Sequence, residues 1–450
     1  MANTYLSRTP SSNGSKTTNT ISLWVKRGKL GATQRLFSQL NTGGSGNPDD
    51  YIAFDDVDKI NFQFYGDGTN GVNNGYLVTN RKFRDTSAWY HIVAVQDTTN
   101  GTSGNRLRLY VNGVRETSFS TENYPSQNTQ GGAINNTSYP LFIGQRGNNA
   151  GYFDGSISHV HFSDGYAYEP TVFGSTDSTT GEWKINASPS FTPGTNGFTI
   201  LKDGNTITDQ SANSNNFSLG GGTLTKTEDN PSNVFATLNP LSHFFGTAPT
   251  FSNGNNTVTT SSASGSINPS PATLGITSGK WYWEGKLVNA PSSNYALIGI
   301  MAQAPAAAGG QNFLGGVNDT YGYASWNGTL YNSAGSTGNT SGGATYTTGD
   351  ILSIAVDADN NRLYYYKNGT IQNSGTGIVI PAAADTLFGA WLPAVGDWDT
   401  PSLVWSCNFG NGFFGTTAVS SAGTNASGNG IFEYDVPTNY TALSTKGLNI

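Results

Sequence analysis

Paired carboxylates would be the clearest sign of hydrolytic chemistry, because cleavage of a glycosidic bond needs two of them a few ångströms apart, as acid and as nucleophile or base. The sequence has seven glutamates, and no two lie within five residues of each other: Glu116, Glu122, Glu169, Glu182, Glu228, Glu284 and Glu433. It also has no Gly-x-Ser-x-Gly motif and no phosphate-binding loop. We therefore predict that the protein is not an enzyme, although an aspartate pair joined only by the fold stays open.

Aspartates are concentrated in residues 49–59, where five occur: Asp49, Asp50, Asp55, Asp56 and Asp58. Hard cations such as Ca²⁺ take clustered carboxylate oxygens, so this stretch is a candidate calcium site. Its spacing matches no loop motif with a defined order of ligands. We favour a solvated acidic loop and predict no cofactor.

Histidine and cysteine offer weaker signals. His159 and His161 are two residues apart on a predicted strand and would point the same way, as zinc ligands do. With no cysteine nearby, an exposed pair is the favoured interpretation. Cys407, the single cysteine, is predicted to be a small core residue because the sequence nominates no base to activate its thiol.

Aromatic side chains are the remaining candidates for a binding role, because rigid rings give contact area at low entropic cost. Tyr364 and Tyr366 should share one face of a strand, with Leu363 and Tyr365 on the other. Six residues in predicted loops could line a surface that binds protein or stacks on sugar rings: Trp326, Tyr331, Trp391, Asp397, Trp398 and Asp399. The alternative is that most of these rings belong to the core.

Composition limits the classes of partner. Only 11% of the 450 residues are charged, and the net charge is -7 with a pI of about 5.1, so the chain has no basic run with which to neutralise phosphates. We predict no nucleic acid partner. One cysteine excludes an intrachain disulfide framework. The start of the sequence has no secretory signal, and no window approaches about 18 apolar residues, so we predict synthesis in a cytoplasm and no membrane insertion.

Two β-hairpins organise the sequence. Residues 106–114 and 362–372 each carry a basic residue, alternating apolar positions and Asn-Gly, a pair that suits the two positive-φ positions of a type I′ turn. An apolar strand precedes each hairpin, at residues 90–95 and 351–356. Residues 89–96 are apolar on both faces and are predicted to form a central strand of a sandwich.

The first half of the chain resembles the laminin G-like domain of the concanavalin A-like superfamily, a two-sheet jelly roll. The resemblance covers about residues 20–174 and is carried by three motifs in order: Trp-Tyr-His-x-Val (89–93), Arg-x-x-Leu-Tyr-Val-Asn-Gly (106–113) and aromatic-Asp-Gly-x-Ile (153–157). The closing segment, residues 163–174, resembles a tail of such domains in bacteriophage structural proteins.

The second half resembles the SPRY domain, another two-sheet sandwich. Its motifs span about residues 250–412: Trp-Tyr-Trp-Glu (281–284), Ile-Gly-Ile (298–300), Tyr-Gly-Tyr (321–323), Gly-Asp-Ile-Leu-Ser-Ile-Ala-Val-Asp (349–357), Leu-Tyr-Tyr-Tyr-Lys-Asn-Gly (363–369) and Asn-Phe-Gly (408–410). Residues 229–240 and 432–446 resemble the connector and the end of phage proteins with this domain order.

We therefore expect an all-β chain of two β-sandwich, jelly-roll-like domains joined by an irregular linker, with residues 1–174 as the first domain, 175–240 as a linker with short strands and 241–450 as the second domain with a tail. The resemblance implies a virion component of a bacteriophage, in a fibre, tail or capsid surface. Its partners would be other virion subunits and a host glycan or surface protein, and it could form a homo-oligomer. An architectural decoration protein and a glycan-active hydrolase are the alternatives.

Overall fold

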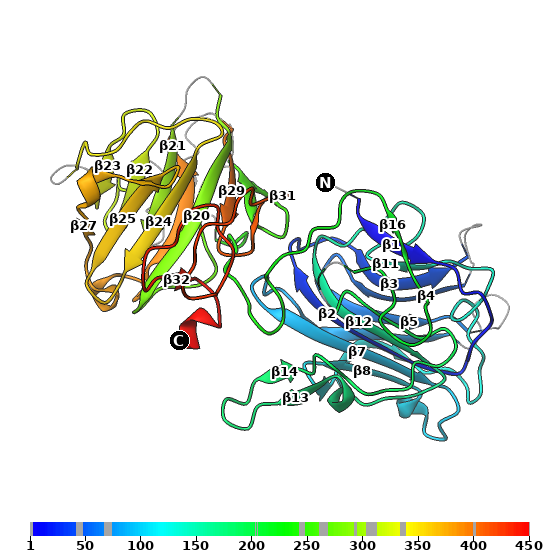
Figure 1. The fold of residues 1–450 in the computed structure, drawn as a ribbon. Coiled ribbons are helices and arrows are strands. Elements are labelled where there is room, and N and C mark those ends of the chain that lie inside the picture. Colours follow the sequence, from blue (N-terminus) through cyan, green and yellow to red (C-terminus); the bar gives the residue numbers. More distant parts are fainter. Residues whose placement is uncertain are drawn as a thin grey trace. The chain divides into compact units, whose positions relative to one another are not determined.

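The computed structural model is almost entirely β-structure, as the sequence predicts, and it describes residues 3–41, 48–66, 74–202, 204, 206–242, 248–260, 269–291, 295–302, 313–333, 339–398 and 402–449. The chain divides into two compact units, Met1–Lys226 and Thr227–Ile450, each with two large sheets (Figure 1). The described helices are short 3₁₀ turns: η2 (Ser103–Asn105), η3 (Pro170–Val172), η4 (Asn373–Gly375), η5 (Ala383–Asp385) and η6 (Gly447–Asn449). None of the described helices is long and apolar enough to cross a membrane.

The first unit is an antiparallel sandwich. Its larger sheet has the order β10 (Phe119–Asn123), β6 (Gly75–Lys82), β5 (Lys59–Phe64), β4 (Asp49–Phe54), β3 (Gln34–Leu40), β11 (Leu141–Ile143), β1 (Tyr5–Arg8) and β16 (Ser218–Gly220). The smaller sheet has the order β15 (Phe198–Ile200), β12 (Gly155–Asp164), β2 (Thr18–Arg27), β7 (Trp89–Asp97), β8 (Leu107–Val111) and β9 (Val114–Arg115). A separate pair joins β13 (Gly174–Thr176) and β14 (Trp183–Ile185).

Alternation along the strands fills the space between these two sheets. Leu23 of β2 and Ile92 of β7 belong to the same buried cluster as Phe54 of β4 and Phe62 of β5. The prediction that β7 is a central strand is confirmed, since it pairs with β2 on one side and with β8 on the other.

The other face of β7 is also buried, under residues 166–192. Val93 and Val95 pack against Phe173 in a small cluster that includes Phe191. In Figure 1 the β13 and β14 hairpin lies beside β7 and β8. This segment therefore forms a third layer over the smaller sheet.

The second unit is also a sandwich. Its larger sheet has the order β17 (Thr250–Ser252), β18 (Thr257–Thr259), β29 (Val404–Asn408), β20 (Lys280–Asn289), β24 (Ile351–Asp357), β25 (Arg362–Lys367) and β26 (Thr370–Ile371), with β27 (Ile378–Val379) on β25 and β32 (Thr441–Ala442) on β20. Its smaller sheet has the order β19 (Ser270–Pro271), β28 (Leu392–Asp397), β21 (Ala296–Met301), β22 (Thr320–Ala324) and β23 (Leu330–Asn332). A short ribbon joins β30 (Phe413–Phe414) and β31 (Thr417–Ala418).

Large aromatic side chains fill the core of the second sandwich. Trp283 of β20 and Trp405 of β29 are fully buried there, together with Ile298 and Val395 from the smaller sheet. Cys407 is also fully buried in this cluster, and burial raises the pKa of its thiol well above the ordinary value. The prediction that Cys407 is a core residue is confirmed.

Both Asn-Gly turns have the predicted geometry. The φ angles are 49° and 77° at Asn112 and Gly113, and 46° and 79° at Asn368 and Gly369, as a type I′ turn requires. Each asparagine side chain also accepts a backbone N–H from the preceding strand, from His91 at 2.8 Å and from Ile351 at 2.9 Å. The two hairpins thus use the same turn chemistry.

The predicted linker at residues 175–240 differs from the structure. Within this range β15 pairs with β12 and β16 pairs with β1, so residues up to Lys226 belong to the first unit. Residues from Thr227 onward belong to the second, where Phe235 bridges to Ser444 and the Ala236 N–H donates to the Leu443 carbonyl at 3.0 Å. β15 and β16 are three residues long, too short to show periodicity, and their partners β12 and β1 lie outside this range.

Candidate binding site

The outer face of the smaller sheet in the second unit carries the best candidate site. On β21, Ile298 and Ile300 point into the core, whereas Leu297 and Met301 point outward, and Ala394 of β28 joins them on that outer face. Because β21 runs antiparallel to β22 and β28, its start lies beside the ends of those two strands. Residues that flank these strand ends are therefore brought together.

Four half-buried aromatic side chains meet at these strand ends: Tyr295 before β21, Trp326 after β22, Tyr331 in β23 and Trp398 after β28. We call these four residues the ring surface. The ring centroids of Trp326 lie 5.1 Å from those of Trp398, 5.3 Å from Tyr295 and 6.0 Å from Tyr331. The backbone N–H of Trp398 also donates to the backbone carbonyl of Tyr295 at 3.1 Å. The rings therefore hold one another in fixed positions.

The aliphatic side chains directly beneath the rings are buried. Leu297, Met301 and Leu314 are at most 1% exposed, whereas Trp326 and Trp398 are half-buried. The buried ring of Phe313 lies beneath, 4.8 Å from Trp398 and 5.3 Å from Tyr331. Aliphatic side chains thus support the rings and leave the rings to contact a ligand.

The structure divides the residues predicted to line a binding surface. It brings Trp326, Tyr331 and Trp398 together, but Trp391 is fully buried in the core, 5.5 Å from Tyr321. Asp397 is 1% exposed and lies on the same side of β28 as the core residue Val395. Trp391 and Asp397 are therefore corrected to interior positions. Asp399 lies outside the described residues.

Tyr364 and Tyr366 lie elsewhere, on the outer face of the larger sheet. Both rings are half-buried and pack against a cluster that includes Tyr282 and Phe432. Leu363 and Tyr365 point the other way into the core, so the predicted alternation of this strand is confirmed. The two tyrosines cannot join the ring surface, because the whole sandwich lies between the two faces.

Glu284 is a feature of that second face which sequence reasoning missed. Its carboxylate is fully buried and accepts hydrogen bonds from Tyr282 Oη at 3.1 Å, Asn408 Nδ2 at 3.3 Å and the backbone N–H groups of Glu433 and Tyr434 at 2.9 and 3.0 Å. Burial raises its pKa to about 7 against the opposing effect of these bonds. Glu284 thus fastens the C-terminal segment, red in Figure 1, to the sheet.

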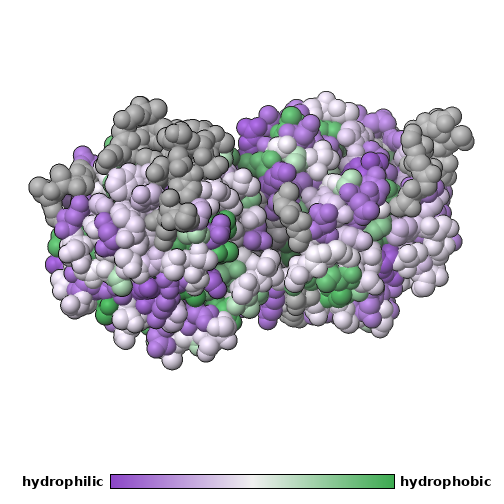
Figure 2. Space-filling view, turned by 90° about the horizontal axis from the view of Figure 1, so that it is seen from above, coloured by the Kyte–Doolittle hydropathy of each residue, from purple (hydrophilic) through white to green (hydrophobic). Residues whose placement is uncertain are grey.

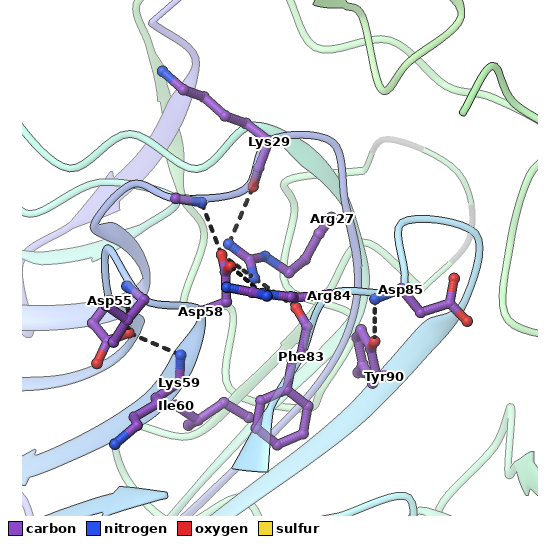
Figure 3. A network of polar contacts seen from close by, with 12 residues as sticks. Arg27, Lys29, Asp55, Asp58, Lys59, Ile60, Phe83, Arg84, Asp85 and Tyr90 are labelled. Atoms are coloured by element: carbon purple, nitrogen blue, oxygen red, sulfur yellow. Dashed lines mark hydrogen bonds and ion pairs between the residues drawn. The ribbon is translucent and has the colours of Figure 1, made fainter. Parts of the chain in front are cut away.

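The aspartates of the candidate calcium site form ion pairs and hydrogen bonds with other groups of the protein. Asp58 lies 3.0 Å from Arg27 Nη1 and 3.0 Å from Arg84 Nε, and it accepts the Gly31 N–H at 2.8 Å (Figure 3). Burial alone would raise the pKa of Asp58, but these partners together hold it below its ordinary value. Asp55 Oδ1 accepts the N–H groups of Val57 and Lys59, which closes the local turn.

Asp49 and Asp50 are likewise structural. Asp49 forms ion pairs with Arg35 at 3.3 Å and Arg146 at 3.2 Å. Asp50 accepts three backbone N–H groups, and burial raises its pKa to about 7. The favoured interpretation of a solvated acidic loop is wrong for Asp49, Asp50 and Asp58, which are buried, whereas Asp56 is exposed. Among the residues that the structure describes, no three acidic, histidine or cysteine side chains gather as a metal site would require.

The predicted exposed pair of histidines is also corrected. A register irregularity between Ser158 and His161 turns His159 to φ 48°, and His161 is 2% exposed with its ring stacked on Phe173 at 5.5 Å. Burial lowers the pKa of His161 to about 3. Its Nδ1 lies 3.0 Å from Thr199 Oγ1, so it packs as a core residue.

A serine and a histidine also meet in the first unit, but not as a nucleophile and base. Ser22 Oγ lies 2.9 Å from His91 Nε2, and Trp183 Nε1 donates to His91 Nδ1 at 2.9 Å. Because Nδ1 accepts, Nε2 carries the ring proton and donates to the serine. His91 therefore cannot take a proton from Ser22 in this arrangement.

Apolar side chains outside the ring surface are scattered. Large examples such as Leu387 and Val114 are 71% and 66% exposed. On the face seen in Figure 2, hydrophobic residues form small separate patches among hydrophilic ones. Single exposed apolar residues are ordinary on protein surfaces and need no ligand.

Comparison with known proteins supports two domain families. Residues 2–173 match the concanavalin A-like lectin/glucanases superfamily, in its laminin G form, and residues 280–392 match the SPRY domain. No curated protein matches the sequence.

Three solved structures resemble parts of the chain. The SPRY domain of human HERC1 is 18% identical over 38% of this chain and 96% of its own, with a TM-score of 0.29. A second human SPRY domain is 18% identical over 37% and 94%, with a TM-score of 0.28. A heptameric SAP-like pentraxin from Limulus polyphemus is 16% identical over 35% and 69%, with a TM-score of 0.25. The family matches support a laminin G-like, concanavalin A-like domain followed by a SPRY domain.

Proposed function

We propose that the protein is a non-enzymatic component of a bacteriophage virion, in a fibre, tail or capsid surface, that binds a host-surface glycan or protein through its ring surface. The observation that carries this proposal is the cluster of Trp326, Tyr331 and Trp398, three half-buried rings fixed by mutual contact on an outer sheet face. Partly exposed, preorganised aromatic residues are the side chains that most often dominate binding energy.

The two domain families suggest a binding role as well. The virion assignment is supported by the resemblance of residues 163–174, 229–240 and 432–446 to segments of phage structural proteins. In the structure the last two segments lie together, since the Val234 N–H donates to Thr445 Oγ1 at 3.0 Å and the Lys446 N–H donates to Asn233 Oδ1 at 3.1 Å. Both segments belong to the second unit.

A glycan-active hydrolase is the less favoured alternative. The two carboxylates whose pKa burial raises to about 7, Asp50 and Glu284, are the natural candidates for an acid. Both carboxylates are buried and accept hydrogen bonds from backbone N–H groups, so neither can reach a glycosidic oxygen at the surface. An architectural decoration protein without a host ligand is the second alternative.

Binding of the purified chain to a panel of bacterial strains tests the proposal. We expect the chain to bind at least one strain, and we expect a Trp326→Ala/Trp398→Ala variant to lose that binding. Tyr166→Ala removes an aromatic side chain that is 44% exposed in the first unit and serves as the matched control. Density on the head of a particle, together with no binding to any strain, would favour the decoration protein instead.

A further inference from the structure

We propose that the ring surface binds an uncharged polysaccharide and not an acidic one. This inference rests on the binding role proposed above and narrows its ligand.

The sequence around three of the four rings is almost free of charge, whereas Trp398 stands between Asp397 and Asp399. From Leu287 to Gly349 the only charged residue is Asp319. It comes directly before β22, whereas Trp326 follows the other end of that strand, and the five residue-to-residue steps from Asp319 to Ala324 span about 17 Å of extended chain. The Asp319 carboxylate also accepts a hydrogen bond from the Leu387 N–H at 3.3 Å, at the end of β22 that is away from Trp326.

The sheet beneath the rings is equally neutral. Its five strands contain a single charged residue, Asp397, which is 1% exposed on the core side. An acidic polysaccharide needs cations to balance its carboxylates, and no described residue of this face supplies one. The net charge of the chain, -7, opposes such a ligand further.

The chemistry that remains suits a neutral sugar. A sugar ring presents C–H groups on its faces and hydroxyl groups at its edge. The accessible rings of Trp326 and Trp398 can contact the former, and the phenol hydroxyls of Tyr295 and Tyr331 can bond the latter. A protein partner would find few accessible aliphatic side chains beside the rings, because Leu297, Met301 and Leu314 are buried and the half-buried Leu392 lies at the other end of β28 from Trp398.

Binding measurements with defined polysaccharides test this inference. The full chain is titrated with dextran, mannan and galactan as neutral probes, and with polygalacturonate and polysialic acid as acidic probes, at low and at high salt. We expect binding to at least one neutral probe, unchanged within about twofold by salt, since no ion pair is screened. Trp326→Leu and Trp398→Leu, which keep apolar packing but remove the ring, should each weaken it at least tenfold. Tyr166→Ala should not change it.

Cell binding separates the remaining outcomes. If binding to bacterial cells depends on the ring surface, is unchanged within about twofold by salt and is removed by periodate oxidation of the cells, the inference stands even where no panel polysaccharide binds. Binding that is removed by protease and resists periodate would identify a protein ligand and overturn it. Salt-sensitive binding to acidic probes alone would also overturn it, while leaving the proposed binding role intact. A chain that binds no cell and no polysaccharide would overturn both proposals.

Discussion

Trp183 donates its indole N–H to Nδ1 of His91 at 2.9 Å, and the two rings stack with their centroids 5.9 Å apart. Trp24 stacks on His91 at 4.7 Å, and Trp183 also covers the Asn112–Gly113 turn, where an added Cβ at Gly113 would lie 2.4 Å from its ring. Trp183 thus fastens the third layer of the first unit to both its central strand and its hairpin.

This relationship predicts a pH dependence for the first unit. Burial, with a smaller contribution from His159, lowers the pKa of His91 to about 3, so the folded state favours the neutral ring. Stability from His91 is complete above its unfolded pKa of about 6.5 and is lost as pH falls toward 3, by up to about 1.4 kcal/mol per pH unit. We expect His91→Gln to reduce the pH slope of thermal unfolding between pH 6 and 4. An unchanged slope would show that His91 takes no part in it.

Glu284 predicts the opposite dependence for the second unit. Its folded pKa of about 7 lies above the ordinary carboxyl value, so the stability from its protonated form is present at low pH and is lost as pH rises through 7. We expect the amides of Glu433 and Tyr434 to lose hydrogen-exchange protection over that range, and Glu284→Gln to remove the dependence. Glu433→Gln, at a half-buried position nearby, is the control that should keep it.

Truncation of Glu284 should also be costly. Glu284→Ala leaves two partly buried backbone N–H groups, the Tyr282 hydroxyl and the Asn408 amide without their acceptor, which we expect to destabilise the second unit by about 3 kcal/mol. Denaturant unfolding monitored by tryptophan fluorescence measures this. A loss under about 1 kcal/mol would mean that the C-terminal segment is held by its apolar contacts.

The hairpin glycines give a packing prediction. Gly113→Ala must adopt a positive φ and also meet the Trp183 ring, whereas Gly31→Ala has a similar φ of 65° and no atom within 4 Å of the new Cβ. We expect about 1 kcal/mol of destabilisation for the control and at least about 2 kcal/mol for Gly113→Ala. If Gly113→Ala and Gly31→Ala reduce the stability in thermal unfolding equally, the contact with Trp183 is contradicted.

Calcium should have little effect on stability. Arg27 and Arg84 pair with Asp58, and Arg35 and Arg146 pair with Asp49, so these carboxylates already have cationic partners. We expect the melting temperature to shift by less than about 1 °C when Ca²⁺ is added or chelated. A melting temperature that rises by several degrees with Ca²⁺ would support the calcium site after all.

The sequence predicted what depends on local chemistry. The Asn-Gly turns and the two-sided strand β7 follow from residue types and from alternation within a few positions. The order of motifs was sufficient to indicate both domain families. Residues 175–226 could not be placed in the same way, because β15 and β16 pair with strands that the local sequence does not reveal.

The faces of β28 show why the candidate site was only partly predictable. Alternation puts Trp391 and Trp398 on opposite sides of this strand, yet Asp397 suggests the wrong assignment, since a charged residue is normally expected to face solvent. In the structure Asp397 faces inward and Trp398 outward. Glu284 was missed for another reason: it lies with Tyr282 on the outer face of β20, where the distant C-terminal segment covers it.

The ring surface is tested most directly by an equilibrium titration of the full chain, and of its Trp326→Leu/Trp398→Leu variant, against a bacterial strain that the chain binds. Thermal unfolding of both proteins confirms that the variant is folded. Loss of hot-spot rings worth about 2 kcal/mol predicts binding that is at least about thirtyfold weaker. Binding that stays within about twofold of the original would contradict the assignment of this surface as the binding site.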